Sequence, residues 1–299
     1  MQTPRFAGRG WRLLGPNSVV MARGPDSFGL VGAVLGVLAG KKRFAKYAGQ
    51  WSAFPGERLP ARLQRWFYAS SLWGGPVFAN AAPDPRRPRL VSILNASLSR
   101  QDWQQAEQGS HAREHTGPLR LLFAGRITPA KGIDTLLRAV ALCVQAQHAV
   151  QLDVVGDGSE RPAAEKLAKA LDLGACVTFH GWVGRAALFE HYRQADTFLS
   201  GSRHQGLDKV VLEAMSFGLP IVATDISVMP FLVQPPRCGL LVPPDDPPAM
   251  AQAIQTLLVA PQQRTQMGQN ARARSADFLF EDLEVRFRQM LREHLRLAV

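Results

Sequence analysis

The sequence predicts an α/β protein built around parallel β-sheets, and two of its patterns carry this prediction. From residue 119 onward, short apolar and β-branched runs alternate with amphipathic stretches of helical length. This alternation is typical of βαβ units, in which helices cover both faces of a parallel sheet. Four of the first five runs also end at or beside a glycine, at the edge where such sheets form their ligand crevice.

The elements of this second half follow in order along the chain. Strands are predicted at 119–125, 150–156, 175–181, 195–201, 220–225 and 239–243, and helices at 134–147, 160–173, 185–195, 209–217, 247–259 and 281–297. No internal repeat is visible, so we predict one complete doubly wound domain.

The first part of the chain carries fewer elements of the same kind. Strands are predicted at 17–23, 42–47 and 76–80, and helices at 27–39 and 60–72. Because three strands are few for a doubly wound domain, we predict that this domain is incomplete at its N-terminus. The polar stretch 106–118 is the predicted linker. The expected domains are therefore residues 1–117, residues 118–280, and a last helix over 281–299 that packs back on the N-terminal domain.

Composition narrows the class of protein. A chain of 299 residues with 46% hydrophobic content can bury two cores. Cys143, Cys176 and Cys238 share no short spacing, so we expect buried thiols in a reducing cytoplasm and neither a disulfide framework nor a metal knuckle. The longest uncharged apolar run, 28–40, has 13 residues, whereas a membrane span needs roughly 20.

The positive charge lies mostly in the first part of the chain. Residues 1–117 contain 16 Lys and Arg against 6 Asp and Glu, which accounts for nearly all of the net charge of +11. An anionic membrane surface, an anionic substrate, nucleic acid or an ordinary solvated surface would each explain it. Arg62, Arg65, Trp66, Phe67 and Tyr68 make the membrane a candidate partner. Nucleic acid is not expected, because no recognised motif or aromatic stacking platform occurs.

The loop after the 119–125 strand is the first candidate site. Arg126 and Lys131 lie five residues apart, and Thr128-Pro129 is a predicted helix start. Two cations beside the N–H groups of a helix N-terminus suit a phosphate group. A solvated strand-to-helix turn is the alternative.

Two further stretches point to the same edge of the sheet. Gly156 ends a strand and would let a ligand approach the backbone, while Asp157 is interpreted as part of a tight turn. In the stretch 202–220, Gln205 precedes a predicted helix that carries Glu213 on its second turn. An apolar helix buries a carboxylate only when something hydrogen-bonds it, so Glu213 is a site candidate or a residue of the polar face. Asp245-Asp246 is interpreted as a turn and helix cap.

Taken together, the chain from about 119 to 275 resembles the GT-B glycosyltransferases of family 4. The resemblance rests on LLFAGRITPAKGIDTLLRA, LDVVGDGSE, VTFHGWV, YRQADTFLSGSRHQGLDKVVLEAMSFGLPIVATD and GLLVPPDDPPAMAQAI. It implies two Rossmann-like domains, the N-terminal one incomplete here. It also implies a retaining, metal-independent hexosyltransferase that moves a sugar from a nucleotide-diphosphate sugar to a glycan or lipid-linked acceptor.

The resemblance assigns roles to individual residues. It implies Arg126, Lys131 and Gln205 as catalytic residues, and Gly125, Gly156, Gly181, Gly206, Leu207 and Glu213 as donor-binding residues. Arg126 and Lys131 would hold the diphosphate, Glu213 the ribose, and the backbone near 181–183 the base. No metal or further cofactor is expected, and no Asp-x-Asp motif occurs.

Several positions depart from the family pattern. Gln205 stands where the family usually has Glu, and Ser227-Val228 stands where it usually has Gly-Gly. No His precedes His111, and Tyr47 to Trp51 occupies roughly the position of the family's N-domain His. On the order of 80–100 residues of the usual first domain have no counterpart. The alternative is therefore a catalytically impaired or fragmentary GT-B protein that binds a nucleotide sugar or a partner transferase.

Overall fold

The computed structural model describes residues 14–15, 18–53, 57–94, 98–107, 117–203, 207–234 and 237–295, and it contains two compact units. The first unit comprises residues 1–95 together with 282–299, and the second comprises 96–281. This division lies before helix α4 (Arg100–Glu107), not at residue 117 as the sequence suggested. Helix α4 belongs to the second unit because Trp103 Nε1 donates to Ser275 Oγ at 2.9 Å, and the Arg272 guanidinium stacks over the indole ring.

The first unit contains a four-stranded parallel sheet. Its strands are β1 (Val19–Gly24), β2 (Lys42–Tyr47), β3 (Val77–Ala79) and β4 (Leu90–Ser92), in that spatial order, and its first two helices are α2 (Ser27–Leu38) and α3 (Leu59–Ala69). The predicted strands and helices are confirmed to within a few residues. Strand β4 was not predicted, because only three residues pair and prolines and arginines precede them.

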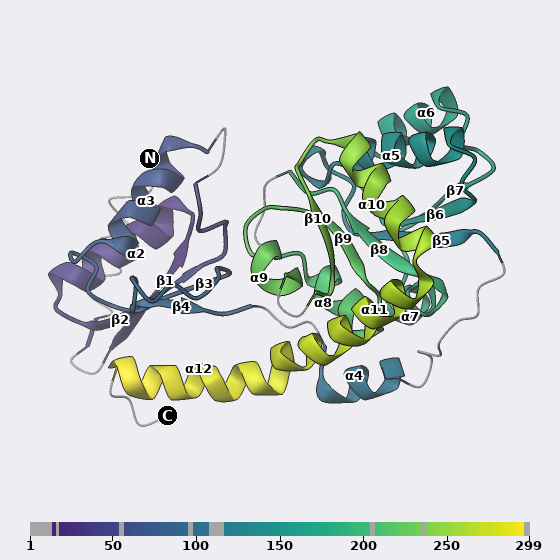
Figure 1. Ribbon diagram of the computed structural model, residues 1–299. Helices are drawn as coiled ribbons and strands as arrows, with labels where there is room; N and C mark the ends of the chain where they lie inside the picture. The colour runs from purple at the N-terminus through teal and green to yellow at the C-terminus, as the bar shows by residue number, and fades with distance from the viewer. Residues whose placement is uncertain are drawn as a thin grey trace. The chain divides into compact units, whose positions relative to one another are not determined.

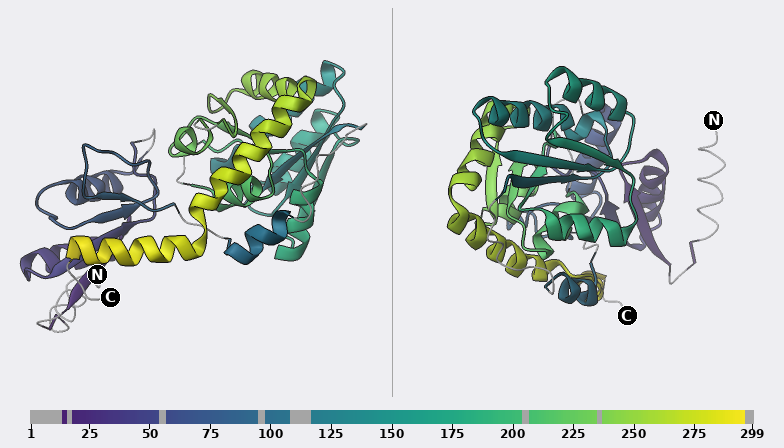
Figure 2. Two further views of the ribbon diagram at one scale, coloured as in Figure 1. Left: turned by 60° about the horizontal axis from the view of Figure 1, so that its bottom comes forward. Right: turned by 90° about the vertical axis from the view of Figure 1, so that its right-hand side faces the viewer.

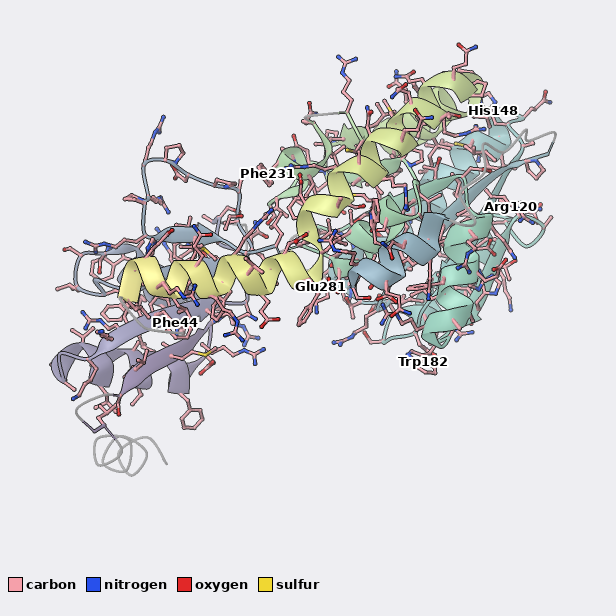
Figure 3. All side chains as sticks on the ribbon, turned by 90° about the horizontal axis from the view of Figure 1, so that it is seen from below. Phe44, Arg120, His148, Trp182, Phe231 and Glu281 are labelled. Atoms are coloured by element: carbon pink, nitrogen blue, oxygen red, sulfur yellow. The ribbon has the colours of Figure 1, made fainter. Side chains whose placement is uncertain are left out.

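Alternate residues of these strands supply two separate apolar faces. One face, with Ala45, Tyr47, Val77 and Ala79, packs under α2 and α3. The other face is covered by the C-terminal helix α12 (Phe280–Leu295), seen below the sheet in Figure 1. Its residues Phe44, Phe78, Ile93, Leu291 and Leu295 form one buried cluster. Phe44 lies beside α12 in Figure 3, with its ring 6.0 Å from that of Phe287.

The second unit contains a six-stranded parallel sheet with helices on both faces (Figure 2). Its strands are β5 (Leu119–Ala124), β6 (Val150–Val155), β7 (Val177–Gly181), β8 (Thr197–Ser200), β9 (Ile221–Thr224) and β10 (Gly239–Val242). Its helices are α5 (Ile133–Gln145), α6 (Arg161–Ala170), α7 (Arg185–Gln194), α8 (Lys209–Ser216), α9 (Met229–Val233), α10 (Pro247–Val259) and α11 (Pro261–Ser275), with short 3₁₀ turns at Pro129–Lys131 and Ala276–Phe278. All predicted strands and helices of this half are confirmed to within a few residues.

The strand order is β10-β9-β8-β5-β6-β7, which is the doubly wound order with a reversal between β5 and β8. At such a reversal the two connections leave toward opposite faces of the sheet, and sheets of this kind bind their ligands at that point. The loops after β5 and β8 are therefore the place to look for a site. The core on one face joins β5 and β6 to α5, α6 and α10. On the other face, the rings of Phe189, Tyr192, Phe198 and Phe217 stack against one another.

Helix α11 is the longest element that the sequence did not predict. Its sequence, PQQRTQMGQNARARS, contains one large apolar residue, Met267, and its other buried positions are Gly268, Ala271 and Ser275. A helix that packs through small residues shows no apolar periodicity, and this explains why it was missed. Among the described residues, no helix combines the length and the apolar character that a bilayer crossing requires.

The packing of α12 on the first sheet yields a stability prediction. Leu291 is 8% exposed within the cluster of Phe44 and Phe78, whereas Val285 on the same helix is 65% exposed. We expect Leu291→Ala to lower the free energy of unfolding of the first unit by about 2–5 kcal/mol, because it leaves a cavity. Val285→Ala should change it by less than about 0.5 kcal/mol. Denaturant unfolding of both variants checks this, and equal losses would show that α12 does not stabilise the sheet.

Candidate functional site

The loops after β5 and β8 meet at the strand-order reversal, as the sequence predicted. Arg203 N donates to the Ala130 carbonyl at 2.9 Å, which ties the second loop to the first. Gly132 has a φ of +60°, and a Cβ on it would lie 2.0 Å from the Gly201 carbonyl oxygen. The two loops can therefore approach this closely only because glycine stands at their contact.

Three of the glycines predicted to bind the donor, Gly125, Gly156 and Gly181, lie along one edge of the sheet. Gly125 N donates to the Val155 carbonyl and Gly156 N to the Gly181 carbonyl, so the ends of β5, β6 and β7 are joined in sequence. A Cβ on Gly156 would lie 1.9 Å from the Gly125 carbonyl oxygen, and its φ is +138°. Glycine is therefore required at this position by the packing of the backbone alone, independently of any ligand.

Lys131 is already engaged by a carboxylate at this edge. Its Nζ forms a short ion pair with Asp208 Oδ1, and Ser202 Oγ donates to Asp208 Oδ2 at 2.9 Å. Asp208 occupies the N-cap position of α8, yet its side chain makes no cap hydrogen bond. The pair joins the β5 loop to the start of α8, and its side chains are only 12% and 16% exposed. The sequence analysis did not identify Asp208, because 77 residues separate the partners.

The predicted helix start at Thr128-Pro129 is wrong in one respect. Pro129 begins a 3₁₀ turn that ends at Lys131, and α5 starts only at Ile133 after the left-handed Gly132. Lys131 is thereby held ahead of the helix, where its side chain reaches Asp208. Arg126, at the start of the same loop, is exposed, and no described carboxylate lies within ion-pair distance of it.

Arg203 fixes the shape of the β8 loop. Its guanidinium donates to both Asp134 oxygens at 2.7 and 2.8 Å, to Asp245 Oδ1 at 2.6 Å and to the Pro129 carbonyl at 2.5 Å. Partial burial disfavours the charged Asp134, but the hydrogen bonds and charge of Arg203 outweigh it and lower the pKa of Asp134. Asp246 caps α10 by accepting from Ala249 N, which confirms the interpretation of that acidic pair as a turn and cap.

Glu213 lies on the second turn of α8, and a buried tyrosine orients it. Tyr192 Oη donates to Glu213 Oε2 at 3.0 Å. Burial and the neighbouring Glu213 carboxylate raise the pKa of Tyr192 well above its ordinary value, so the hydroxyl stays protonated as a donor. This is the hydrogen-bond partner that an inward carboxylate on an apolar helix requires. Among the residues that the structure describes, no hydrogen-bond donor contacts Oε1 of Glu213.

Other predicted positions have different outcomes. Gln205 and Gly206 lie outside the described residues, and Leu207 is half-buried beside the start of α8. Ser227 has a φ of +53°, so a serine adopts the left-handed conformation at a position where the resembled family has glycine. The following Val228 is buried and cannot offer an open contact to a ligand.

The first unit corrects part of the membrane prediction. Tyr68 is in the core, Phe67 packs against it, and Arg65 is paired with Glu57, so these three side chains do not face solvent as a group. Arg62 and Trp66 are exposed. Tyr47 and Trp51, at the position of the family's N-domain His, are also buried, with ring centroids 5.2 Å apart.

Comparison with known proteins agrees with this geometry. Residues 118–259 match the family described as Glycosyl transferases group 1. The alpha-D-kanosaminyltransferase of Streptomyces kanamyceticus is 32% identical over 151 residues, which cover 50% of this chain and 39% of that protein. This chain thus spans well under half the length of that relative.

Solved structures share the fold over nearly the whole chain. A glycosyltransferase from Rickettsia africae superposes with a TM-score of 0.76 at 16% identity, covering 99% of this chain and 82% of that one. The Anabaena protein HepE in complex with UDP superposes with a TM-score of 0.74 at 19% identity, covering 97% and 82%. Residues 118–259 are thus similar to the group 1 glycosyltransferases, and the two sheets share the GT-B fold of these solved structures.

Proposed function

We propose that the chain binds a nucleotide-diphosphate sugar at the β5–β8 edge and transfers its sugar with retention of configuration. One observation carries this proposal: the strand-order reversal brings Lys131 to the start of α8, the helix that carries Glu213. A cation and the N–H groups of a helix N-terminus at one point match a diphosphate. The Anabaena structure with UDP supports a donor of this chemical class.

In the proposed reaction the protein stabilises the leaving group. The donor C1–O bond breaks with its electron pair passing to the diphosphate oxygen, while an acceptor hydroxyl oxygen forms the new bond to C1. The acceptor proton passes to the departing diphosphate. Negative charge grows on the diphosphate in the transition state, and Lys131, Arg126 and the first N–H groups of α8 would stabilise it there. These cations would take the place that a metal ion has in other transferases.

Glu213 would hold the ribose of the donor. Tyr192 occupies Oε2 and fixes the orientation of the carboxylate, so Oε1 would accept a hydrogen bond from a ribose hydroxyl. The base would lie near Gly181, where the φ of +70° turns the chain out of β7. Gln205 would contact the sugar through its amide, which forms hydrogen bonds but brings no negative charge.

A second candidate function is binding of a nucleotide sugar without rapid turnover. The observation that favours it is the ion pair between Asp208 and Lys131, which neutralises a cation that the leaving group needs. A diphosphate must displace or share this pair, and Asp208 would also repel it. Assays of sugar transfer and of nucleotide binding on the same preparation separate the two functions.

The first prediction concerns the cations of the β5 loop. We expect Arg126→Ala and Lys131→Ala each to weaken the binding of UDP or GDP by about 1.5–3 kcal/mol, because each removes a charge-assisted phosphate contact. Lys169→Ala, an exposed lysine in the last turn of α6, is the matched control and should bind as the parent does. Calorimetry with both nucleotides is the measurement. Unchanged affinity in both variants would reject the phosphate site.

The second prediction tests whether the Asp208 carboxylate competes with the phosphates for Lys131 or positions Lys131 to bind them. Asp208→Asn keeps the shape of the side chain but releases Lys131 from its ion pair and removes a negative charge near the phosphates. We expect UDP or GDP to bind roughly tenfold more tightly, or about 1.4 kcal/mol. Ser202→Ala, which removes only the hydroxyl contact to Asp208, should have a much smaller effect. Weaker binding by Asp208→Asn would mean that Asp208 positions Lys131 for its ligand.

We also infer that the acceptor is held at an anionic membrane surface, so that a lipid-linked acceptor fits best. Leu59, Leu63 and Trp66 form an exposed apolar stripe on α3, and Arg58 and Arg62 flank it. An apolar stripe beside cations is suited to the interface of an anionic bilayer.

Vesicle sedimentation tests this inference. We expect the chain to bind vesicles that contain an anionic lipid, to bind less with added salt, and to lose most of this binding in the double variant Leu63→Ala, Trp66→Ala. Trp182→Ala is the control, because Trp182 is 80% exposed in the other unit (Figure 3). Equal binding to neutral and anionic vesicles would leave an ordinary solvated surface.

A further inference from the structure

Three side chains that commonly bind metals meet on the sheet of the second unit. Asp153 comes from β6, His180 from the neighbouring β7, and His191 from α7. One ligand atom of each lies within 4.8 Å of the other two. His180 Nε2 is 2.5 Å from Asp153 Oδ1, and the two imidazole rings have centroids 4.4 Å apart. Among the described residues this is the one such group of three.

His180 lies at an irregularity in the strand pairing, on the face of the sheet that also carries Asp153. Val154 is opposite Phe179 and Val155 is opposite Gly181, so His180 is the extra residue of a β-bulge. Bulges are rare between parallel strands and are over-represented at the edges of sheets and beside functional sites.

The donor set suits a borderline transition metal. Two imidazole nitrogens and one carboxylate oxygen are typical ligands of Zn²⁺, with bond lengths of about 2.0–2.2 Å. Ligands of a tetrahedral ion at these distances lie about 3.4 Å apart, so small rotations of the three side chains would close the site. His180 and Asp153 are 28% and 32% exposed, which gives an ion a path and leaves a position for water.

We propose that Asp153, His180 and His191 bind one Zn²⁺ ion that joins β6, β7 and α7. In the metal-free state a hydrogen bond between His180 Nε2 and Asp153 Oδ1 holds the two side chains together, and the metal would take the place of that bond. The ion would stabilise the outer edge of the sheet, where β7 has a strand on one side only. It takes no part in the proposed sugar transfer, because its ligands hold no donor phosphate in that scheme.

Zinc titration of the chelator-treated full chain tests the proposal, with no nucleotide present. We expect one Zn²⁺ per chain to bind at micromolar or lower concentration and to raise the melting temperature, since the ion binds the folded state. His180→Gln, His191→Gln and the isosteric Asp153→Asn should each weaken this binding at least tenfold and reduce the rise in melting temperature. Co²⁺ in place of Zn²⁺ should give a visible absorption band that these variants lose.

Two controls test whether zinc binds at the proposed cluster and not elsewhere in the chain. His148→Gln alters a half-buried histidine in the turn that follows α5 and should leave zinc binding unchanged. Circular dichroism without metal shows whether each variant is folded, and the conservative Asp153→Asn keeps the test open should a histidine variant unfold. Absence of stoichiometric binding would overturn the proposal. So would zinc binding of equal strength in the parent and in a folded double variant, His180→Gln with His191→Gln. Neither result would bear on nucleotide binding at Lys131.

Discussion

The reversal of strand order between β5 and β8 is the constraint on which the rest of the site depends. It sends two connections to opposite faces of one sheet and brings their first residues together at the carboxyl edge. Contact this close excludes side chains, and the backbone of Gly132 therefore meets that of Gly201 directly. Once the loops are in contact, Arg203 can reach three partners across them, and Lys131 can reach the first residue before α8. The strand order thus determines which side chains can meet at the site.

Ion pairs hold the loops at this edge of the sheet in place, and one of the charged groups, Lys131, would also contact a ligand. Arg203 donates its hydrogen bonds to Asp134, Asp245 and a backbone carbonyl, so it stabilises the loops and does not bind an anion. Lys131 differs, because its ion-pair partner Asp208 is exchangeable for a phosphate of higher charge. A preformed ion pair keeps the lysine in place, which lowers the ordering cost of binding, but it subtracts the energy of the broken pair. The balance of these two effects determines how tightly a nucleotide would be held.

The sequence predicted the elements well where burial is periodic, and poorly where it is not. Strands such as β5 and β9 are mostly apolar and mostly buried, while α11 packs through glycine, alanine and serine and leaves no such pattern. The glycines and Glu213 of the site were predicted from local motifs. Two other groupings were not predicted: the pair of Lys131 with Asp208, and the cluster of Asp153, His180 and His191. Each joins elements that are distant in sequence, and the cluster includes a residue at a shift in strand register. Gln205, on which the question of turnover rests, stays a prediction.

Helix α12 has a consequence for the order in which the protein is made. The apolar face with Phe44 and Phe78 is synthesised early, yet the residues that cover it, 282–295, emerge from the ribosome after the whole second unit. Domains usually fold in the order of their synthesis. Here the second unit can complete its core while the first still exposes aromatic side chains to water. The first unit therefore finishes folding last. Until then, its exposed apolar face can bind chaperones or associate with neighbouring nascent chains.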